Sequence, residues 1–515
     1  MPKIKIIDLF AGPGGLGEGF SSYQTDDGNF PFEIVASVEK EASAHQTLQL
    51  RSFFRKFPRE NVPDEYYQYV RGDGVSRTQL FEKYPEQSKA AIAETLGGPT
   101  ALGVDNELIH AKIAEVLAGF DGPKMVIGGP PCQAYSLVGR SRNKGKAGYS
   151  AKKDLRHFLY KEYLEILHLV QPHVFVMENV KGILSSKVEG EHIFPRILND
   201  LKNPGEALLK DSKATYKIYS FVTEPLDRDG EPGYKKNTDF IIRSENYGIP
   251  QARHRVILLG VRSDIAAIPG LLKLAPKVSV GDVLESLPKL RSGISKRKDN
   301  ATEWYATVER AKNQLVEILR KNDQSDLVRH ILSSQRFHHD LGRGARYVPS
   351  LGNAQVPNAL SNWYFDGKLH GVLNHETRGH MYSDLQRYLY CSYFVQNVND
   401  IENNSPKAKD FPKELAPNHQ NWESGKFADR FRVQSRNRFA TTITSHISKD
   451  GHYFIHYDPA QCRSLTVREA ARLQTFPDNY FFEGNRTEQY VQVGNAVPPF
   501  LAKQIAHIVQ ALLSS

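Results

Sequence analysis

Cys132 stands where a chemically active side chain would be held in place. It lies in the stretch from Val126 to Ser136, VIGGPPCQAYS, where an apolar run of strand character gives way to two glycines and two prolines. Glycine allows close backbone approach and proline stiffens a turn, so the side chain that follows has a fixed position. A thiolate there can act as a nucleophile if neighbouring groups lower its pKa. Most intracellular cysteines are inert core residues, so this interpretation depends on what the rest of the chain supplies.

Charged side chains follow or precede two other predicted strands. Glu178 closes the apolar stretch HVFVMENV, and open α/β sheets place functional groups at the carboxyl ends of strands. Arg253 and Arg255 lead into the apolar strand 256–261, and residues two apart in an extended backbone point the same way. Beside an anionic substrate the two arginines would make a planar hydrogen-bonding fork. The alternatives are a capping acid for Glu178 and a surface ion-pair element for the arginines.

A glycine turn near the start of the chain predicts a ligand site. Residues 3–10 indicate a buried strand, the sequence AGPGG follows, and residues 16–22 indicate a helix. Strand, glycine turn and helix are typical of sites where a nucleotide-like ligand meets a helix N-terminus. Glu39 follows the next predicted strand, 32–38, where a carboxylate accepts hydrogen bonds from ribose hydroxyls. The spacing is not the full GxGxxG pattern, which favours an adenosine-type ligand without a pyrophosphate; a plain tight turn is the alternative.

The elements that must position these residues follow from periodicity and turn signals. The pattern predicts a helical insertion at 75–120, helices at 155–170 and 466–474, and long helices within 303–333. It also predicts short strands at 441–444 and 453–457 and a closing helix that ends at Leu513. Thr466 and Glu469 have the spacing of a capping box. The segment 139–156 is rich in glycine and basic residues, which fits either a solvated surface loop or a mobile lid whose Arg140, Arg142, Lys144 and Lys146 meet phosphates.

Length and composition bound the answer. A chain of 515 residues predicts two to four domains, and no stretch has the length of a membrane span or signal peptide, so we expect a cytoplasmic protein. The three cysteines, Cys132, Cys391 and Cys462, form no CxxC pair, which argues against a disulfide framework and a zinc site. His375 and His380 fit polar recognition or structural hydrogen bonding better than metal binding. The net charge of +9 suits a polyanionic partner without requiring one.

Six motifs in a fixed order resemble the DNA (cytosine-5)-methyltransferases over nearly the whole chain. They are DLFAGPGG at 8–15, GPPCQAYS at 129–136, MENV at 177–180, QARHR at 251–255, RSLTVREAARLQTFPD at 463–478 and VGNAVPP at 493–499. The resemblance implies an α/β fold: a Rossmann-like sheet of S-adenosylmethionine-dependent methyltransferases with an inserted, irregular α+β target recognition domain. It implies a catalytic and cofactor-binding domain at 1–275, the target recognition domain at 276–435 and a return to the catalytic domain at 436–515.

The resemblance also implies a mechanism. The Cys132 thiolate would add to C6 of a flipped-out cytosine, Glu178 would contact N3 and the exocyclic amine, and Arg253 and Arg255 would support O2 and the active site. C5 would then receive the methyl group of S-adenosylmethionine, and loss of the C5 proton would release Cys132. By the same resemblance the cofactor contacts are Phe10, Gly12, Gly14, Leu16, Glu39 at the ribose, Asp73 at the adenine, Pro131, Leu159, Asn495 and Ala496. Nearly sixty residues separate Asp73 from Cys132, which implies an insertion. Arg140, Arg142, Lys144 and Thr442 are the expected DNA contacts, and no metal site is expected.

The expected activity is therefore methylation of cytosine C5 within a specific sequence of double-stranded DNA. The expected protein is a monomer without a membrane partner, acting as the modification enzyme of a restriction-modification system or as an orphan methylase. Where a cognate restriction endonuclease exists, no stable complex with it is expected. Two alternatives stay open at this point: a tRNA cytosine-5 methyltransferase of the same fold, which the large 276–435 segment disfavours, and a non-catalytic DNA-binding regulator, which would have lost Cys132 or Glu178.

Overall fold

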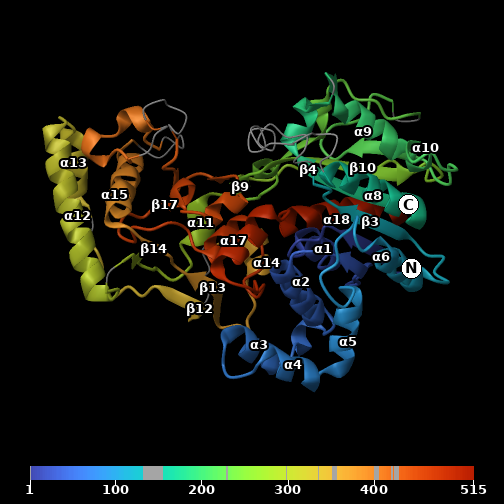
Figure 1. The fold of residues 1–515 in the computed structure, drawn as a ribbon, viewed down its shortest axis with the longest axis horizontal. Helices are drawn as coiled ribbons and strands as arrows, with labels where there is room; N and C mark the ends of the chain where they lie inside the picture. The colour runs from blue at the N-terminus through green and yellow to red at the C-terminus, as the bar shows by residue number, and fades with distance from the viewer. Residues whose placement is uncertain are drawn as a thin grey trace.

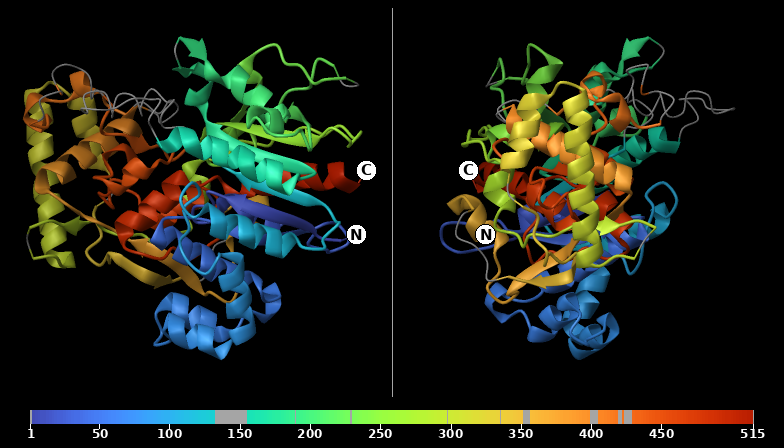
Figure 2. Two further views of the ribbon diagram at one scale, coloured as in Figure 1. Left: turned by 45° about the vertical axis from the view of Figure 1, so that its right-hand side comes forward. Right: turned by 90° about the vertical axis from the view of Figure 1, so that its left-hand side faces the viewer.

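The computed structural model places two lobes side by side, with the C-terminal helices between them (Figures 1 and 2). A lobe built on the central sheet lies at the right of Figure 1, and a helical lobe lies at the left. The structure describes residues 2–131, 155–188, 190–227, 230–296, 298–334, 336–350, 356–398, 405–418, 422 and 429–514.

A seven-stranded sheet organises the first lobe. The strand order is β2-β1-β3-β4-β10-β7, with β8 paired to β10, and the strands are β1 (Ile4–Leu9), β2 (Phe32–Val38), β3 (Lys124–Gly128), β4 (Val174–Val180), β7 (Tyr216–Ser220), β8 (Ile241–Arg243) and β10 (His254–Arg262). Strands β2, β1, β3 and β4 run parallel, whereas β10 runs antiparallel to both β4 and β7. The predicted strands at 3–10, 32–38, 173–180 and 256–261 are confirmed, as is the Rossmann-like fold class. The reversal of β10 brings its first residues to the edge where β4 ends.

Helices cover both faces of this sheet because its central strands are apolar on both sides. Helices α1 (Gly15–Ser21) and α18 (Pro499–Ser514) pack on one face through Leu16, Phe20, Leu501 and Ile505. The other face is covered by α6 (Asn106–Leu117), α8 (Leu155–Val170) and α9 (Ile193–Lys202). The closing helix α18 therefore belongs to the same core as the first strand of the chain, and it brings the segment before it to the glycine turn.

A helical excursion follows β2 and joins the two lobes. After α2 (Ala42–Arg55) the chain forms α3 (Asp64–Arg71), α4 (Arg77–Lys83) and α5 (Pro85–Glu94) at the bottom of Figure 1. The guanidinium of Arg346 donates to the carbonyls of Tyr69 and Val70 and stacks on the rings of Tyr69 and Phe481, 5.0 and 4.3 Å from their centroids. The predicted helical insertion is confirmed, and its helices begin before residue 75.

The helical lobe has its own hydrophobic core. Helices α12 (Ala301–Lys321), α13 (Ser325–Ser333) and α15 (Tyr382–Asn397) pack around Trp304, Leu315 and Leu389, and the same cluster takes in Val433, Ile455 and Cys462. The core thus continues past residue 435, and the domain boundary expected there stays a prediction. The other elements are β12 (Gly344–Pro349) paired with β13 (Gly371–Glu376), β11 (Gly293–Ile294) with β14 (Gly379–His380), β15 (Val433–Gln434) with β17 (Ile455–His456), β16 (Ala440–Thr441) with β9 (Gln251–Ala252), β5 (Lys187–Val188) with β6 (Glu191–His192), and α10 (Pro204–Ala207), α11 (Val280–Leu284), α14 (Asn358–Tyr364), α16 (Val467–Leu473) and α17 (Arg486–Asn495).

Two sequence predictions on the C-terminal segment need correction in extent. The strand expected at 441–444 is reduced to β16, because the Ile443 amide donates to the side chain of Gln251 instead of to a strand. The strand expected at 453–457 is reduced to β17, since the Phe454 amide donates to Gly451 in a 3-10 turn. The helices predicted at 155–170 and 303–333 are confirmed, and Thr466 and Glu469 cap α16 as predicted. Among the described residues, no helix is long and apolar enough to span a membrane.

Candidate functional site

The carboxyl ends of β3 and β4 bring Glu178 next to the segment that leads to Cys132. Gly128 is paired with Met177, so Gly129 lies beside Glu178 at the edge of the sheet. A Cβ atom on Gly129 would lie 3.0 Å from Glu178 Oε2, a contact tighter than almost all real ones. The side chain of Asn179 donates to the carbonyl of Pro130, 3.1 Å away, and fixes the turn further. Glycine at 129 is therefore what lets the carboxylate sit against this turn.

Arg255 completes the pair with Glu178. Glu178 is directly opposite Ile257 in the antiparallel β4–β10 pair, and Arg255 lies two residues from Ile257 on the same face. Arg255 Nε and Glu178 Oε1 are 2.8 Å apart, and the two side chains are 15% and 14% exposed. The Nε–H does not point along this contact and has no hydrogen-bond acceptor among the described residues, so the contact is an ion pair. The guanidinium Nη1 is fixed by the His254 carbonyl at 2.9 Å.

The arginine fork expected from Arg253 and Arg255 does not form. Arg253 precedes β10, is 1% exposed and donates to the backbone carbonyls of Ile443, Gly494 and Asn495 at 2.9, 3.2 and 3.4 Å. Burial, followed by the neighbouring charge of Arg255, lowers the pKa of this guanidinium. Both terminal nitrogens donate to backbone carbonyls, while Nε has no hydrogen-bond partner among the described residues, so Arg253 joins segments of the chain. The two-residue periodicity failed because residue 253 lies outside the regular strand.

The glycine turn after β1 has the backbone that the sequence predicted. Phe10, Gly12 and Gly14 have φ values of 55°, 58° and 94°, the left-handed region that glycine favours. Glu39 lies across the turn, where one carboxylate oxygen accepts from the Gly12 amide and the other from the Glu41 amide, each at 2.7 Å. Burial raises the pKa of Glu39, and the backbone hydrogen bonds act against this rise. A Cβ atom on Gly12 would meet no atom of the described residues within 4 Å, so this side of the turn is open.

The C-terminal segment 495–497 lies against this turn. A Cβ atom on Gly15 would stand 2.3 Å from the carbonyl oxygen of Val497 and 3.3 Å from the Cβ of Ala496. Asn495 is exposed, whereas Ala496 and Leu16 are buried. The structure thus brings Gly12, Gly14, Leu16, Glu39, Asn495 and Ala496 into one region, although nearly the whole chain separates them in sequence.

Asp73 does not lie in this region, which corrects the sequence prediction. It follows α3 in the helical excursion, is 53% exposed and pairs with Arg71 at 2.8 Å. The chain returns to the sheet edge only at Thr100, whose amide donates to the carbonyl of Glu39 at 2.9 Å. The segment from Thr100 to Asp105 follows, and a Cβ on Gly103 would lie 3.3 Å from Cδ2 of Leu159, another predicted cofactor contact. Asp105 precedes Cys132 by 27 residues, a shorter separation than that of Asp73.

The expected DNA contacts divide between described and undescribed residues. The hydroxyl of Thr442 donates to the carbonyl of Ala252 at 2.5 Å, which places it beside the QARHR motif. Pro131 is the last residue described before a gap in the described chain. Cys132, Arg140, Arg142 and Lys144 lie outside the described residues.

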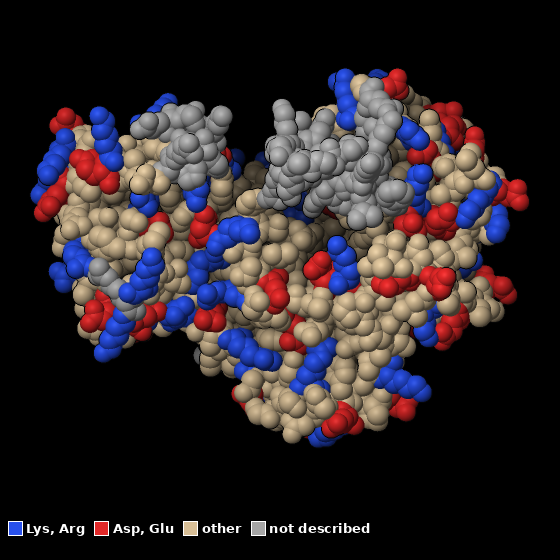
Figure 3. Space-filling view, in the orientation of Figure 1, with Lys and Arg blue, Asp and Glu red and all other residues tan. Residues whose placement is uncertain are grey.

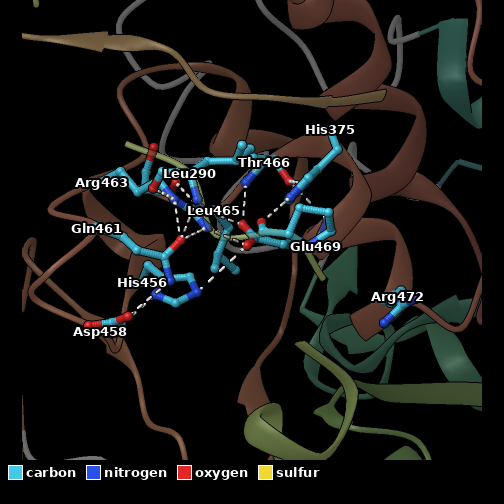
Figure 4. Close-up of polar contacts among 12 residues, drawn as sticks. Leu290, His375, His456, Asp458, Gln461, Arg463, Leu465, Thr466, Glu469 and Arg472 are labelled. Carbon is cyan, nitrogen blue, oxygen red and sulfur yellow. Dashed lines mark hydrogen bonds and ion pairs between the residues drawn. The ribbon is translucent and has the colours of Figure 1, made fainter. Parts of the chain in front are cut away.

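The motif at 463–478 forms an interior network instead of a surface (Figure 4). Arg463 and Glu469 are each 1% exposed and are joined by two hydrogen bonds of 2.7 and 2.6 Å. His375 lies between the hydroxyl of Thr466 and the carbonyl of Pro288, at 2.9 and 2.8 Å. The structural hydrogen-bonding alternative for His375 is therefore confirmed. Within the described residues, no group of three or more His, Cys, Asp or Glu side chains is placed to hold a metal ion.

A cavity of about 420 Å³ adjoins this network and is lined by Lys289, Arg436, Tyr457 and others. None of the described candidate site residues lines it, so the cavity is separate from the Glu178–Arg255 pair. On the face shown in Figure 3 the surface is hollowed between the two lobes, and several Lys and Arg side chains follow one another down its middle.

Comparisons with known proteins agree with this geometry. The model of the family described as C-5 cytosine-specific DNA methylase matches residues 105–511. The chain is 32% identical to the type II methyltransferase M.Bpa9945I of Bacillus paralicheniformis, over 99% of each chain. It is 25% identical to the DNA (cytosine-5-)-methyltransferase M.ApeKI of Aeropyrum pernix, over 78% of this chain and 83% of the relative.

A crystal structure described as a putative DNA modification methyltransferase encoded within an Escherichia coli prophage shares the fold. The TM-score is 0.53 at 18% sequence identity, and both chains are covered completely. The family match covers well over half of the chain and includes the strand that carries Glu178 and the segment that carries Arg255. This chain belongs to the C-5 cytosine-specific DNA methylase family.

Proposed function

We propose that this enzyme transfers a methyl group from S-adenosylmethionine to C5 of a cytosine flipped out of a specific sequence of double-stranded DNA, with Cys132 as nucleophile. The observation that carries the proposal is the placement of Glu178. Its carboxylate lies against Gly129, three residues before Cys132, and is held by Arg255 at the edge of the sheet that also carries the glycine turn. An acid, a cation and the approach to a cysteine at one edge suit the activation of a pyrimidine ring.

The side chains divide the work on the base. The thiolate of Cys132 forms a bond to C6, which moves electron density to C5 and to the ring nitrogen N3. Glu178 contacts N3 and the exocyclic amine and stabilises the charge that develops there. Arg255 holds the Glu178 carboxylate and faces the carbonyl O2. C5 would take the methyl group as the sulfonium S–CH3 bond breaks and a neutral thioether leaves. The C5 proton would then pass to water, and the S–C6 bond would break to restore the aromatic ring and the free thiolate. A base inside the stacked duplex could not be reached, so flipping must precede the reaction.

The residues around the glycine turn fit the methyl donor, which supplies an electrophilic methyl group on a sulfonium. The open side of Gly12 leaves room for a ligand against bare backbone, and the Glu39 carboxylate stands at the same turn to receive ribose hydroxyls. Phe10, Gly14, Leu16, Pro131, Leu159, Asn495 and Ala496 would form the rest of the site. We propose Asp105 in place of Asp73 for the adenine, because the chain returns to the sheet edge at Thr100.

Thr442 would contact the DNA backbone near the target base, and Arg140, Arg142 and Lys144 would contact phosphates. The hollow between the lobes and the net charge of +9 support a duplex as substrate. Type II methyltransferases among the relatives support a role in restriction-modification, with a cognate endonuclease as the partner activity. The chain would act as a monomer.

The test is methyl transfer from labelled S-adenosylmethionine to duplex DNA and to tRNA, for the wild-type chain and two cysteine variants. We expect label in duplex DNA only, complete loss in Cys132→Ser, and retention in Cys391→Ala. Cys391 is a suitable control because it is fully buried in the helical lobe, where burial raises the pKa of its thiol. Label in tRNA alone would contradict the choice of substrate, and full activity of Cys132→Ser would contradict the mechanism. Bisulfite sequencing of DNA from a host that expresses the protein would then give the target sequence.

A further inference from the structure

The C-terminal end of α17 is satisfied by two buried side chains from elsewhere in the chain. The last carbonyls of a helix have no partner within the helix, so others must supply donors. Gln474 Nε2 donates to the carbonyls of Val493 and Ala496 at 2.8 and 3.3 Å. Arg253 donates to the two carbonyls between them, those of Gly494 and Asn495. The backbone of the segment proposed for the methyl donor is thus fixed by side chains.

Gln474 and Arg253 also connect to the segment proposed to lie beside the target base, Gln474 through Gln251 and Arg253 directly. Gln251 Nε2 donates to Gln474 Oε1 at 2.9 Å and to the carbonyl of Leu473 at 3.0 Å. Its Oε1 accepts from the amide of Ile443 at 2.6 Å, while Arg253 binds the carbonyl of that same residue. Ile443 follows Thr442, so both polar groups of its peptide backbone are held from the QARHR motif. Gln251, Gln474 and Ile443 are all completely buried, where the bonds are not exchanged with water.

The two segments also touch directly. A Cβ atom on Gly494 would lie 2.3 Å from the amide nitrogen of Ser445 and 2.4 Å from the carbonyl carbon of Thr444. A shift of the α17 end therefore moves the 442–445 segment, and the reverse holds as well. Gln251 and Gln474, together with Arg253, form the polar connection between these segments, and β10, which carries Arg255, begins within the QARHR motif at His254.

We propose that Gln251 and Gln474 are positioning residues that couple the methyl-donor segment to the target-base segment, so that binding of the donor and binding of DNA change each other's affinity. The inference rests on the proposed function, because it takes the roles of Asn495, Ala496 and Thr442 from there. Coupling through such a connection is reciprocal and commonly amounts to about 5-fold to 150-fold in affinity.

The experiment uses the full-length chain and two variants that cut the connection at different places. Gln474→Met removes the donors to Val493 and Ala496. Gln251→Met leaves those two bonds in place and removes the bonds that Gln251 makes with Ile443, Gln474 and the Leu473 carbonyl. Gln492→Met is the matched control: Gln492 is 3% exposed, lies on α17 and bonds Thr47 and the Glu483 carbonyl on the side away from the connection. Each protein is measured for melting temperature, for the Kd of S-adenosylmethionine with and without duplex DNA, and for kcat and both KM values.

We expect Gln474→Met to weaken donor binding and to lower kcat on the order of 10-fold to 100-fold, as small misplacements of reacting groups do. For Gln251→Met we expect donor affinity without DNA close to that of the wild type, loss of the DNA-dependent change in that affinity, and a kcat that is lower by about the same factor. Gln492→Met should lower the melting temperature and leave the coupling intact.

Glutamine variants that differ from the wild type only in melting temperature, as the control does, overturn the inference. Should Gln474→Met fail to fold, Gln251→Met decides alone, because the cap on α17 survives in it. A wild-type chain that methylates no duplex overturns the proposed function, and the inference with it. An active wild type whose donor affinity does not respond to duplex overturns the inference only.

Discussion

The buried pair of Arg463 and Glu469 allows a quantitative test of what holds the C-terminal segment together. Both side chains are 1% exposed, and Arg463 also donates to the carbonyls of Leu290 and Ser464. Removing one partner of such a pair leaves an uncompensated buried charge, which costs about 3–5 kcal/mol. In folding units of about 150–250 residues, each kcal/mol of lost unfolding free energy lowers the melting temperature by roughly 2–4 °C. We therefore expect Arg463→Met to lower the melting temperature by roughly 6–20 °C at neutral pH.

The second partner provides the control. In the double variant Arg463→Met/Glu469→Gln the buried charge is gone, while the introduced amide oxygen can still accept from the Thr466 amide in the capping box. The double variant should therefore recover most of the loss, because a buried pair without either charge is close to neutral in stability. A double variant no more stable than Arg463→Met, or a single variant within about 2 °C of the wild type, would refute the assignment of this energy to the ion pair.

The pH dependence of the same variants has a definite sign. Burial alone would raise the pKa of Glu469, but the charge and hydrogen bonds of Arg463 outweigh it and hold the pKa well below its usual range. The native state therefore binds fewer protons than the unfolded state, so the stability from this carboxylate is present above the unfolded pKa of about 4.3 and is lost as the pH falls towards the folded one. In Arg463→Met the effect of burial on Glu469 is opposed only by His456, His375 and the Thr466 amide, and protonation of the carboxylate relieves the penalty. The difference in melting temperature between wild type and Arg463→Met should narrow as the pH falls from 7 to 4.

Two further predictions concern the glycine turn and the strand before it. Gly15→Ala should unfold the turn or prevent donor binding, since its Cβ would stand 2.3 Å from the Val497 carbonyl oxygen. Gly12→Ala should cost only about 1 kcal/mol of stability through its φ of 58° and still weaken donor binding. An equal loss of stability in the two variants would contradict the close packing at Gly15. Asp8 is buried without a hydrogen-bond partner among the described residues, and burial, opposed in part by Arg55, raises its pKa to about 8. The native state keeps this proton between the unfolded pKa and pH 8, so the stability of the protein falls as the pH rises through this range. Asp8→Asn should therefore raise the melting temperature more at pH 8 than at pH 5. A gain in melting temperature that does not depend on pH would argue against a buried carboxyl.

The sequence could predict the sheet and much of the site because local patterns decide them. The strand before Glu178, the glycine turn and the carboxylate of Glu39 follow from apolar runs that end in specific residues. The ion pair of Glu178 with Arg255 was not predicted, because it depends on the antiparallel pairing of β4 with β10. The burial of Arg253 could not be predicted, since its partners at 443, 494 and 495 are distant in sequence. Asp73 failed for a related reason: the helical excursion moves it away from the sheet, and only tertiary contacts show where the chain returns.

The contact between the helical excursion and the β12–β13 hairpin has a consequence for engineering. Arg346 binds Tyr69 and Val70, and the hydroxyl of Tyr67 donates to Asp366 at 2.7 Å. The β12–β13 hairpin is therefore anchored on residues that belong to the first hundred of the chain. A segment 276–435 transplanted from a relative that lacks the excursion would arrive without this anchor, and the orientation of the transplanted hairpin would no longer be set. An exchange of this segment would therefore have to include the excursion.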